Sequence, residues 1–543
     1  MQALVLQSLQ EEQKIMAMAR SSLAPAFVVF ALFCCYASTT VSSQASSSSD
    51  GFLKCLSASI PSQLVFTQSS PSFTPLLKSS IRNPKFFTPS TVRPLYIVTP
   101  TNASHVQAAV VCGRRSGMRI RVRSGGHDYE GLSYRAVRPE PFAVLDLSNL
   151  RAVRVDPQAA TAWVDSGATL GELYYAVGKA SGVLGFPAGL CPTVGVGGHF
   201  SGGGFGMLLR KYGLAVDHVV DAVLVDARGR LLNKNTMGSD VFWAIRGGSG
   251  ESFGVVLSWQ VRLVPVPPKV TVFNLPVTAS QGAVDVVARW QQVAPALPDD
   301  LMIRVVVQQK TANFQSLFLG TCDALLPLMS SRFPELKFNR TYCKEMTWIQ
   351  SVPYIYLGSG STVEDLLNRT TAASVFSSGY KATSDYVRKA IPRDVWTNIF
   401  TQLAQPNAGL MILDPYGGQI AAVPEAATPY PHRAGVLYNI QYMNFWPMAT
   451  ADGSVQTKWI RDFYAFMAPY VSSNPREAYF NYRDLDLGEN VVVGNVSSYQ
   501  AGMVWGQKYF KGNYQRLAMA KGEIDPDDYF RNEQSIPPLA KSK

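Results

Sequence analysis

The sequence lacks the two short motifs that identify the commonest nucleotide-binding folds. The dinucleotide fingerprint G-x-G-x-x-G fails twice, because Phe200 and Phe253 stand where the last glycine is required. A P-loop, G-x-x-x-x-G-K-[ST], does not occur. These absences argue against a Rossmann dehydrogenase and a P-loop NTPase.

Histidine and cysteine are scarce, and the basic residues form no block. The 543 residues include five His and seven Cys without zinc-ligand spacing, so no metal site is expected. The formal net charge is +11, but without a Lys/Arg run we expect no nucleic acid partner. The charge either attracts an acidic wall polysaccharide or is diffuse and has no partner.

Long apolar runs are absent beyond the N-terminus. Residues 23–37 are apolar, follow Lys14 and Arg20, and precede a small polar stretch, as in a secretory signal peptide too short to span a membrane. We predict a signal peptide at residues 1–45, with Met16 or Met18 as alternative starts. The mature protein is expected to be extracellular, in the apoplast or cell wall, with no membrane contact.

The cysteine count agrees with an oxidising compartment. Five cysteines follow the signal, and secreted chains tend to pair their thiols, so one is left over. We predict the bridges Cys55–Cys112 and Cys322–Cys343, although spacing alone does not fix the connectivity. Cys191 is then the odd thiol, either reactive or simply buried. Four N-x-[ST] sequons predict glycosylation at Asn102, Asn339, Asn368 and Asn495.

Hydrophobic periodicity predicts an α+β protein of two or three domains. A single core stops growing near roughly 250–300 residues, far below the length of this chain. Helices are predicted from Ser104, with Gln107 completing a capping box, and from Thr169, with Glu172. Strands are predicted at residues 119–123, 142–147, 162–165, 219–225 and 255–264. The proline-rich residues 265–268 mark a domain boundary, and the aromatic-rich tail is expected to pack back on the first domain.

Two predicted strands beyond this boundary place polar side chains on one face. Residues 302–308 alternate so that Arg304 shares a face with Val306. Residues 436–442 alternate so that Asn439 and Gln441 point the same way. This face either lines a cavity or is an ordinary solvent face.

Three glycine clusters remain, at residues 124–126, 195–206 and 247–254. His127 follows the first cluster and Cys191 precedes the second. Glycines let a large flat ligand approach the backbone, and backbone N–H groups in such loops can hold a pyrophosphate. We therefore predict that His127 and Cys191 bond one flavin. Plain turns are the alternative explanation of the clusters.

Four stretches in fixed order carry a resemblance to one family. RSGGHDYEG, CPTVGVGGHFSGGGFG, RGGSGESFG and NYRDLDLG resemble the plant berberine bridge enzyme-like flavoproteins of the vanillyl-alcohol oxidase superfamily. The grass-pollen group 4 allergens are similar even in CGRRSG-type and YFRNEQSIPPL-type stretches. The resemblance covers residues 51–539. It implies a two-subdomain PCMH-type FAD-binding domain at 46–268 (core 90–266), a substrate-binding domain with a large antiparallel sheet at 269–474, and a C-terminal berberine-bridge-type segment at 475–543.

The resemblance also implies roles for individual residues. His127 would bond the flavin 8α carbon and Cys191 would bond C6, so that two covalent bonds hold FAD. Tyr482 matches a catalytic base whose phenol, with a pKa of about 10, needs a nearby cation such as Arg304. Arg304 and Gln441 would position the substrate oxygen. Further FAD contacts carry over to Ser124, Gly125, Gly126, Asp128, Gly195, Val196, Gly197, Gly198, His199, Val255 or Val256, and Asn481.

Positions that vary among members of the family indicate the electron acceptor and limit the choice of substrate. Val194 matches a position that gates oxygen access, and a small valine there is associated with oxidases, so O2 is the expected acceptor and hydrogen peroxide the product. His199 matches a residue that is Asn in some pollen allergens. Asn439 and Phe205 replace a lysine and a tyrosine of monolignol-oxidising relatives, which leaves phenolic allylic alcohols and carbohydrates both open.

We therefore predict a monomeric, secreted FAD oxidase that acts on a primary alcohol or a sugar hydroxyl. A dehydrogenase that passes electrons to a quinone is one alternative. A non-catalytic, wall-binding protein of the same fold is the other.

Overall fold

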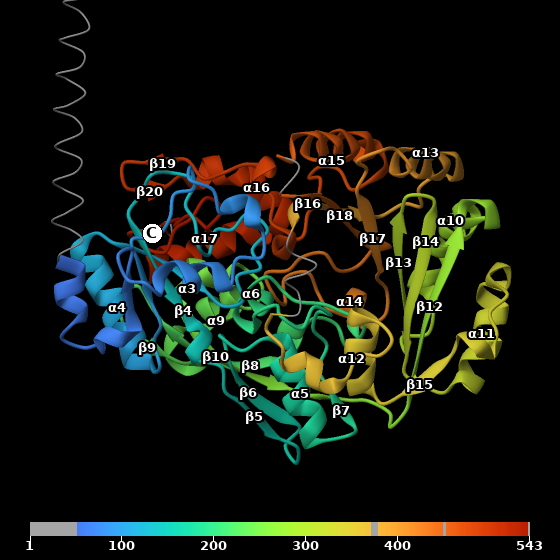
Figure 1. The fold of residues 1–543 in the computed structure, drawn as a ribbon, viewed down its shortest axis with the longest axis horizontal. Coiled ribbons are helices and arrows are strands. Elements are labelled where there is room, and N and C mark those ends of the chain that lie inside the picture. Colours follow the sequence, from blue (N-terminus) through green and yellow to red (C-terminus); the bar gives the residue numbers. More distant parts are fainter. Residues whose placement is uncertain (1–50, 371–377, 449–451, 541–543) are drawn as a thin grey trace, which may run out of the picture.

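The computed structural model describes residues 51–370, 378–448 and 452–540, so the predicted signal peptide at 1–45 lies outside the described residues. This part of the chain is α+β, as predicted. Figure 1 shows a blue-to-green group of elements on the left and a yellow-to-orange group on the right, with the red C-terminal helices over the first group. Within the described ranges, no helix is long and apolar enough to cross a membrane.

The first sheet is small and mixed, and it ends at the first glycine cluster. Its order is β1–β2–β4–β3, in which only β1 is antiparallel to its neighbour. The strands are β1 (Val65–Thr67), β2 (Tyr96–Val98), β3 (Arg119–Arg123) and β4 (Phe142–Asp146). Because β3 runs directly into Ser124, it places His127 just beyond the edge of this sheet.

Helix α4 (Ala103–Ser116) packs on this sheet, and its predicted N-cap, Ser104, is wrong by two residues. The N-cap is Asn102, whose side-chain oxygen accepts a hydrogen bond from the His105 N–H. Asn is as good a cap as Ser, so the periodicity alone did not decide between them. Gly117 ends the helix in the left-handed conformation, with a φ of 68°.

The second sheet is antiparallel, with the order β5–β6–β10–β8–β9. Its strands are β5 (Val153–Asp156), β6 (Thr161–Asp165), β8 (Val219–Val225), β9 (Leu231–Leu232) and β10 (Val255–Arg262). The predicted capping box of Thr169 and Glu172 opens α5 (Leu170–Ala180). The second glycine cluster leads into α6 (Val196–Ser201), and α9 (Ser239–Ile245) precedes the third.

The third sheet is antiparallel and has the order β15–β12–β14–β13–β17–β18–β16. Its strands are β12 (Val270–Thr278), β13 (Leu301–Gln308), β14 (Thr311–Phe318), β15 (Lys344–Met346), β16 (Ser378–Val387), β17 (Leu410–Pro415) and β18 (Tyr438–Pro447). Helices α10 (Ala283–Val293), α13 (Arg393–Leu403) and α15 (Ser454–Met467) pack on one face.

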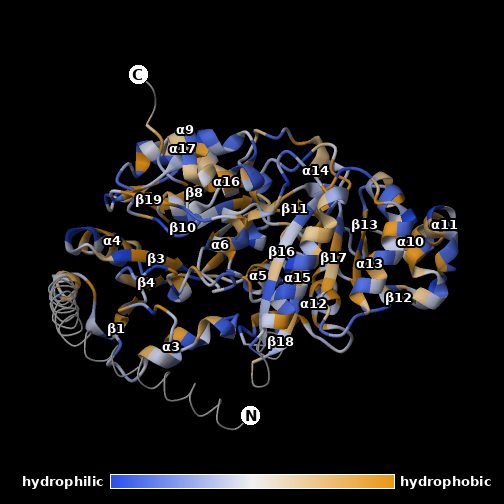
Figure 2. Ribbon diagram, turned by 90° about the horizontal axis from the view of Figure 1, so that it is seen from above, coloured by the Kyte–Doolittle hydropathy of each residue, from blue (hydrophilic) through white to orange (hydrophobic). Residues whose placement is uncertain are grey.

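The two faces of this sheet differ because successive residues of a strand point to opposite sides. Ile303, Val305 and Leu413 belong to the core under the helices. The alternate residues Arg304 and Asp414 face a cavity instead. β17 is drawn mainly in orange in Figure 2, so its one carboxylate stands in an otherwise hydrophobic strand.

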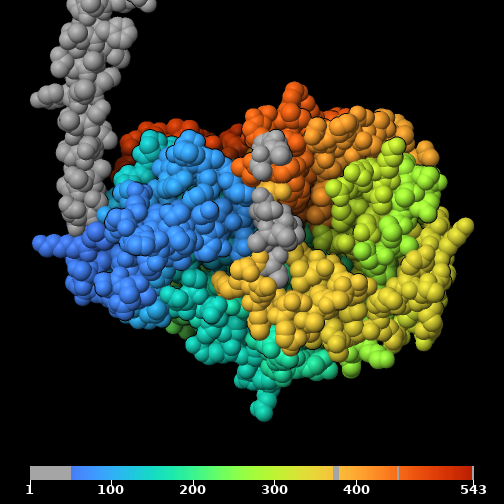
Figure 3. Space-filling view, viewed as in Figure 1, coloured from blue at the N-terminus to red at the C-terminus, as the bar shows by residue number. Residues whose placement is uncertain are grey.

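Helix α12 (Trp348–Leu357) and the 3-10 helix η10 (Val363–Leu367) join the third sheet's half of the molecule to the second sheet. Both pack on α5, and Figure 3 shows the yellow segment that contains them against the teal segment that contains α5. Arg369 also donates to Glu172 of α5 at 2.7 Å. These contacts hold the two halves together on one side of the cavity.

The C-terminal segment returns to the first two sheets through η13 (Phe480–Tyr482), α16 (Tyr499–Phe510) and α17 (Asn513–Ile524). α17 packs on α9, and the buried Lys521 donates to the Ser252 carbonyl at 2.6 Å. Further elements are α3 (Phe73–Ser79), α7 (Leu209–Tyr212), α8 (Lys234–Met237), α11 (Cys322–Arg332), α14 (Gln419–Ala422), β7 (Leu184–Gly185), β11 (Val264–Pro265), β19 (Val492–Val493) and β20 (Val496–Ser497).

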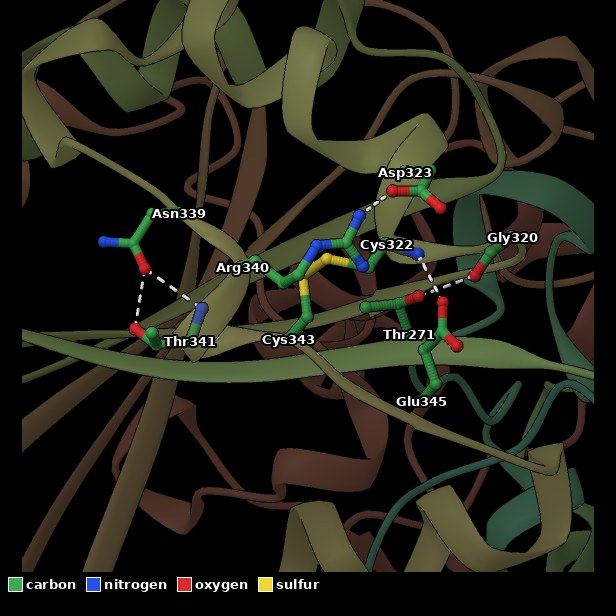
Figure 4. The surroundings of a disulfide bond; sticks show 9 residues. All are labelled: Thr271, Gly320, Cys322, Asp323, Asn339, Arg340, Thr341, Cys343 and Glu345. Atoms are coloured by element: carbon green, nitrogen blue, oxygen red, sulfur yellow. Dashed lines mark hydrogen bonds and ion pairs between the residues drawn. A yellow bond between two sulfur atoms is a disulfide. The ribbon is translucent and has the colours of Figure 1, made fainter.

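Both predicted disulfides are present, Cys55–Cys112 and Cys322–Cys343, and Cys191 is the one thiol left over among the described residues. Figure 4 shows the second bridge, where Glu345 accepts from the Cys322 N–H at 2.8 Å. Beside it, the Asn339 oxygen accepts from Thr341, and its amide nitrogen points away from these bonds. The four sequon asparagines are exposed, which is what a glycan would require.

A buried ion pair fastens the C-terminal tail. Because one partner is a carboxylate, we expect the protein to lose stability at acid pH. Arg121 and Glu533 lie 3.1 Å apart, and both side chains are almost fully buried. Burial alone would raise the pKa of Glu533, but the Arg121 guanidinium and the Val137 N–H outweigh it and lower the pKa to about 2. Since the folded pKa lies below the ordinary value, the pair stabilises the protein above about pH 4.5 and loses this effect as the pH falls toward 2.

Glu533→Gln is therefore expected to lower the free energy of unfolding by about 3 kcal/mol near neutral pH. The penalty should shrink as the pH falls from 4.5 to 2, and Tm measured across that range reads it out. Glu335→Gln, in an exposed pair with Arg289, is the matched control. A penalty for Glu533→Gln that is independent of pH would contradict the argument.

Candidate active site

A cavity of about 590 Å³ lies between the glycine clusters, the polar face of the third sheet and the C-terminal segment. Most of the residues singled out from the sequence line it, although they come from three distant parts of the chain. They are Ser124, Gly125, Gly126, His127, Asp128, Cys191, Val194, Gly195, Gly197, Gly198, His199, Phe205, Val256, Arg304, Gln441, Asn481 and Tyr482.

His127 and Cys191 meet at a single hydroxyl group. The His127 Nε2 lies 2.9 Å from the Thr193 Oγ1, and the Cys191 Sγ lies 3.5 Å from the same oxygen. Burial, with a contribution from Arg82, lowers the pKa of His127 to about 3, so the imidazole is neutral at ordinary pH. A neutral imidazole keeps a lone pair, and the two side chains are therefore nucleophiles presented to the same end of the cavity.

The two glycine clusters touch each other through their backbones. A Cβ atom on Gly125 would stand 2.3 Å from the Gly195 nitrogen, so no other residue fits there. A Cβ atom on Gly198, in contrast, would meet nothing within 4 Å. One glycine thus permits the close approach of the loops, and the other leaves open space along the cavity wall.

His199 is fixed by hydrogen bonds on both sides. Its Nε2 accepts from the Gly189 N–H at 2.9 Å, and its backbone carbonyl accepts from the Asn481 amide at 2.9 Å. Burial lowers its pKa to about 3, so it is neutral. His199 therefore links the second glycine cluster to the C-terminal segment.

Two tyrosines of the cavity lining stack on each other. The rings of Tyr482 and Tyr129 are 5.8 Å apart and within 5° of parallel. Gln441 donates to the Tyr129 hydroxyl at 2.5 Å. Sequence reasoning missed Tyr129, although it stands two residues after His127 in the motif that carried the resemblance.

The expected cation is present, but it has a partner. Arg304 Nε lies 3.3 Å from Asp414 Oδ1, which was not predicted, and both residues line the cavity. Burial raises the pKa of Asp414 while Arg304 lowers it, with a net increase. Burial and Asp414 also raise the pKa of Tyr482 well above its usual range, and Arg304 only partly offsets them. The phenol is therefore protonated at ordinary pH, and Arg304 alone does not ionise it.

Three of the residues singled out do not line the cavity. Val196 and Val255 are fully buried in the cores behind it. Asn439 is also fully buried, donates to the Asp385 carbonyl at 3.1 Å, and leaves its own side-chain oxygen without a hydrogen bond. Phe205 does face the cavity and packs its ring 6.1 Å from that of Tyr482.

Comparison with known proteins identifies the architecture. One family profile, described as FAD binding domain, matches residues 94–234, and another, described as berberine and berberine like, matches residues 478–537. Berberine bridge enzyme-like Cyn d 4 of Cynodon dactylon is 64% identical over 488 residues, which cover 90% of this chain and 93% of that protein. The chain belongs to the berberine bridge enzyme-like family.

Other members and solved structures agree with this assignment. Berberine bridge enzyme-like 18 of Arabidopsis thaliana is 47% identical over 507 residues, covering 91% of this chain and 93% of that protein. The Bermuda grass isoallergen BG60 superposes with a TM-score of 0.88 at 64% identity, and the grass pollen allergen Phl p 4 with 0.88 at 59%. Each match covers 90% of this chain and 100% of the other. The predicted resemblance and fold class are confirmed.

The berberine bridge enzyme-like family binds FAD, and the residues of this cavity fit that cofactor. The open space beside Gly198 and the paired glycine loops form a cradle along one wall. At one end of it, an imidazole and a thiol converge on Thr193. Ser124, Gly125, Gly126, Asp128, Gly195, Gly197, Gly198, His199, Val256 and Asn481 would hold the cofactor, and the chain is an FAD-binding oxidoreductase.

A further charged residue of the cradle had no sequence signal of its own. Arg483 is almost fully buried, and it lies 2.9 Å from Asp128 and 2.7 Å from Glu251. Arg483 directly follows Tyr482, the expected catalytic base, and thereby ties this tyrosine to the first and third glycine clusters. Among the described residues, no group of three or more His, Cys, Asp or Glu side chains could hold a metal ion.

Proposed function

We propose that the protein is a secreted oxidase with bicovalently bound FAD, which oxidises a primary alcohol or a sugar hydroxyl and passes the electrons to O2. The observation that carries the proposal is the convergence of His127 and Cys191 on one buried hydroxyl at the cavity wall. The relative Phl p 4 is described as having glucose dehydrogenase activity, which supports a hydroxyl group as the site of oxidation.

FAD, when bound, supplies the acceptor for a hydride from the carbon that bears the hydroxyl. The chain's own residues must therefore hold the hydroxyl and take its proton. Tyr482 takes the proton, and Arg304 and Gln441 hold the oxygen, since all three line the same end of the cavity. Asp414 completes this set, because its carboxylate lies beside Arg304 and acts on the charge of the Tyr482 phenol.

Val194 supports O2 as the acceptor. A variant of Phl p 4 with isoleucine changed to valine and asparagine changed to histidine is described as a glucose oxidase, whereas the wild type is described as a glucose dehydrogenase. The two changed positions are as far apart as Val194 and His199, and this chain already carries both replacements. A dehydrogenase that uses another acceptor is the second candidate, favoured by the description of wild-type Phl p 4.

Val194→Ile is expected to slow reoxidation of the reduced enzyme by air about tenfold or more, equivalent to about 1.4 kcal/mol or more of activation energy. The larger side chain would fill the space beside the cofactor, while anaerobic reduction by substrate should change less than about twofold. Stopped-flow absorbance measures the two half-reactions separately. Val153→Ile, on β5 outside the cavity, is the control. Reduced wild-type enzyme that persists for minutes in air would exclude the oxidase.

The double attachment is tested on a denaturing gel. Flavin fluorescence should stay in the wild-type protein band after acid treatment. His127→Ala and Cys191→Ala should each retain one bond, and the double variant should release the cofactor. A pigment that leaves the wild type in denaturant, or a fluorescent band in the double variant, would refute the attachment.

Secretion and glycosylation are supported by two disulfides and by exposed asparagines at all four sequons. The domain boundaries at residues 268 and 474 stay predictions. We retain them because the strands of the first two sheets precede residue 268, and those of the third sheet lie between the two boundaries.

A further inference from the structure

The side chain of Thr193 is the common partner of both proposed attachment residues, and the local sequence fixes its place. The Val194 N–H donates to the Cys191 carbonyl at 3.2 Å, which closes a turn with Pro192 and Thr193 at its corners. Proline suits the first corner because its φ is preset. Thr193 is only 1% exposed, so its hydroxyl is held within the protein beside His127 and Cys191.

Thr193 contacts one particular nitrogen of the His127 ring, Nε2. Nε2 lies 2.9 Å from the Thr193 hydroxyl, and the backbone of Thr193 also hydrogen-bonds to this imidazole. A neutral imidazole has one N–H and one lone pair, so a hydrogen on Nε2 leaves the lone pair on Nδ1. A hydroxyl can accept from an N–H and can also donate to a lone pair, which no apolar side chain can do.

We propose that Thr193 is the positioning residue for flavin attachment at His127. Its hydroxyl accepts from Nε2–H and so keeps the nucleophilic lone pair on Nδ1. After the bond has formed, the same hydroxyl donates to Nε2. The inference rests on the proposed double attachment, and it adds the residue that selects the reactive form of the ring.

The reaction that forms the bond between His127 and the cofactor balances when O2 is the oxidant. One C–N bond forms at Nδ1, while one C–H bond of the cofactor methyl group and the Nε2–H bond break. The two hydrogens and two electrons so released reduce the cofactor. They are then removed by O2, which becomes hydrogen peroxide. Thr193 is unchanged overall, in keeping with a role in positioning.

The test isolates the His127 bond by working in a Cys191→Ala background. Thr193→Val keeps the branched shape of threonine but removes the hydroxyl, and Thr193→Ser keeps the hydroxyl. Attachment is followed by flavin fluorescence in the denatured band and by the mass of the His127 peptide. Loss of a buried hydrogen bond worth about 1.4 kcal/mol predicts about tenfold slower attachment for Thr193→Val, and Thr193→Ser should stay within about twofold of its parent.

The outcomes separate this inference from the proposed function. Wild-type protein with no flavin on either peptide would sink the double attachment itself. Attachment at the parent rate in Thr193→Val, or an equal loss in Thr193→Val and Thr193→Ser, would overturn the role of the hydroxyl. His127→Ala in the same background shows how much FAD the fold binds without a bond. Should Thr193→Val not be secreted, Thr193→Ala carries the same test, and attachment at the parent rate would refute the role.

Discussion

Tyr482→Phe is expected to slow flavin reduction by substrate about 10²–10⁴-fold, the usual contribution of a positioned general base. The phenol lies in the cavity between Tyr129 and Tyr479, and phenylalanine would preserve this packing while removing the proton acceptor. Because burial and Asp414 raise the pKa of Tyr482, the phenol must lose its proton as it takes one from the substrate. We expect the Asp414 carboxylate, whose charge acts on the Tyr482 phenol and which lies beside Arg304, to receive that proton. Anaerobic stopped-flow absorbance measures the rate.

The rate of flavin reduction should also depend on pH, and Asp414 sets the direction. Burial raises the pKa of Asp414, so protonation of Asp414 on the acid side should slow the reaction at a higher pH than for an ordinary aspartate. Tyr342→Phe, on the exposed surface, is the matched control. The proposed role requires that Tyr482→Phe still retain covalent flavin. Wild-type reduction rates in that variant would assign the proton to another group.

Local patterns in the sequence predicted much of the fold. The capping box at Thr169 and the mostly apolar run of β8, followed by a turn at Gly229, contain their own boundary signals, and the structure has both elements where they were expected. The N-cap of α4 was misplaced because Asn102 and Ser104 are equally suitable caps. Choosing between them requires knowing where the preceding chain turns, which no local pattern encodes.

The site was predictable only where a motif carried its residues. His127, Cys191 and Tyr482 belong to such motifs, and the structure brings them to one cavity. Asp414 stands in an apolar strand, and its role depends on pairing with Arg304 across the sheet. Asn439 shares a strand face with Gln441, yet it is fully buried and its amide nitrogen donates to the Asp385 carbonyl. Alternation assigns a face to a residue, but only the packed structure shows which part of that face is open.

Lys381→Met is expected to lower the free energy of unfolding by about 3–5 kcal/mol, as when one partner of a buried ion pair is removed. Lys381, in β16, lies 2.8 Å from Glu130 and also pairs with Asp484. The three side chains are at most 7% exposed. Without the ammonium group, Asp484 would lose its buried cationic partner, and Glu130 would keep only Arg135 among the described residues, which lies 3.6 Å away. Tm, followed by flavin fluorescence, measures the loss.

The same ion cluster also holds the catalytic end of the cavity. Glu130 directly follows Tyr129, and Asp484 stands two residues after Tyr482, so Lys381 joins the third sheet to both stacked tyrosines. We therefore expect kcat of Lys381→Met to fall together with Tm, and Lys381→Arg, which keeps the charge, to recover part of both.

A matched control separates this effect from the loss of any lysine. Lys458→Met breaks an exposed pair with Asp462 and should cost at most about 0.5 kcal/mol. Burial lowers the pKa of Lys381, but Asp484 and Glu130 outweigh it and raise the pKa above its usual range. The Lys381 ammonium group therefore stays charged up to about pH 10, so raising the pH within the ordinary range does not break the cluster and substitution is the test. Equal Tm values for Lys381→Met and Lys458→Met would show that this cluster does not hold the three parts of the cavity together.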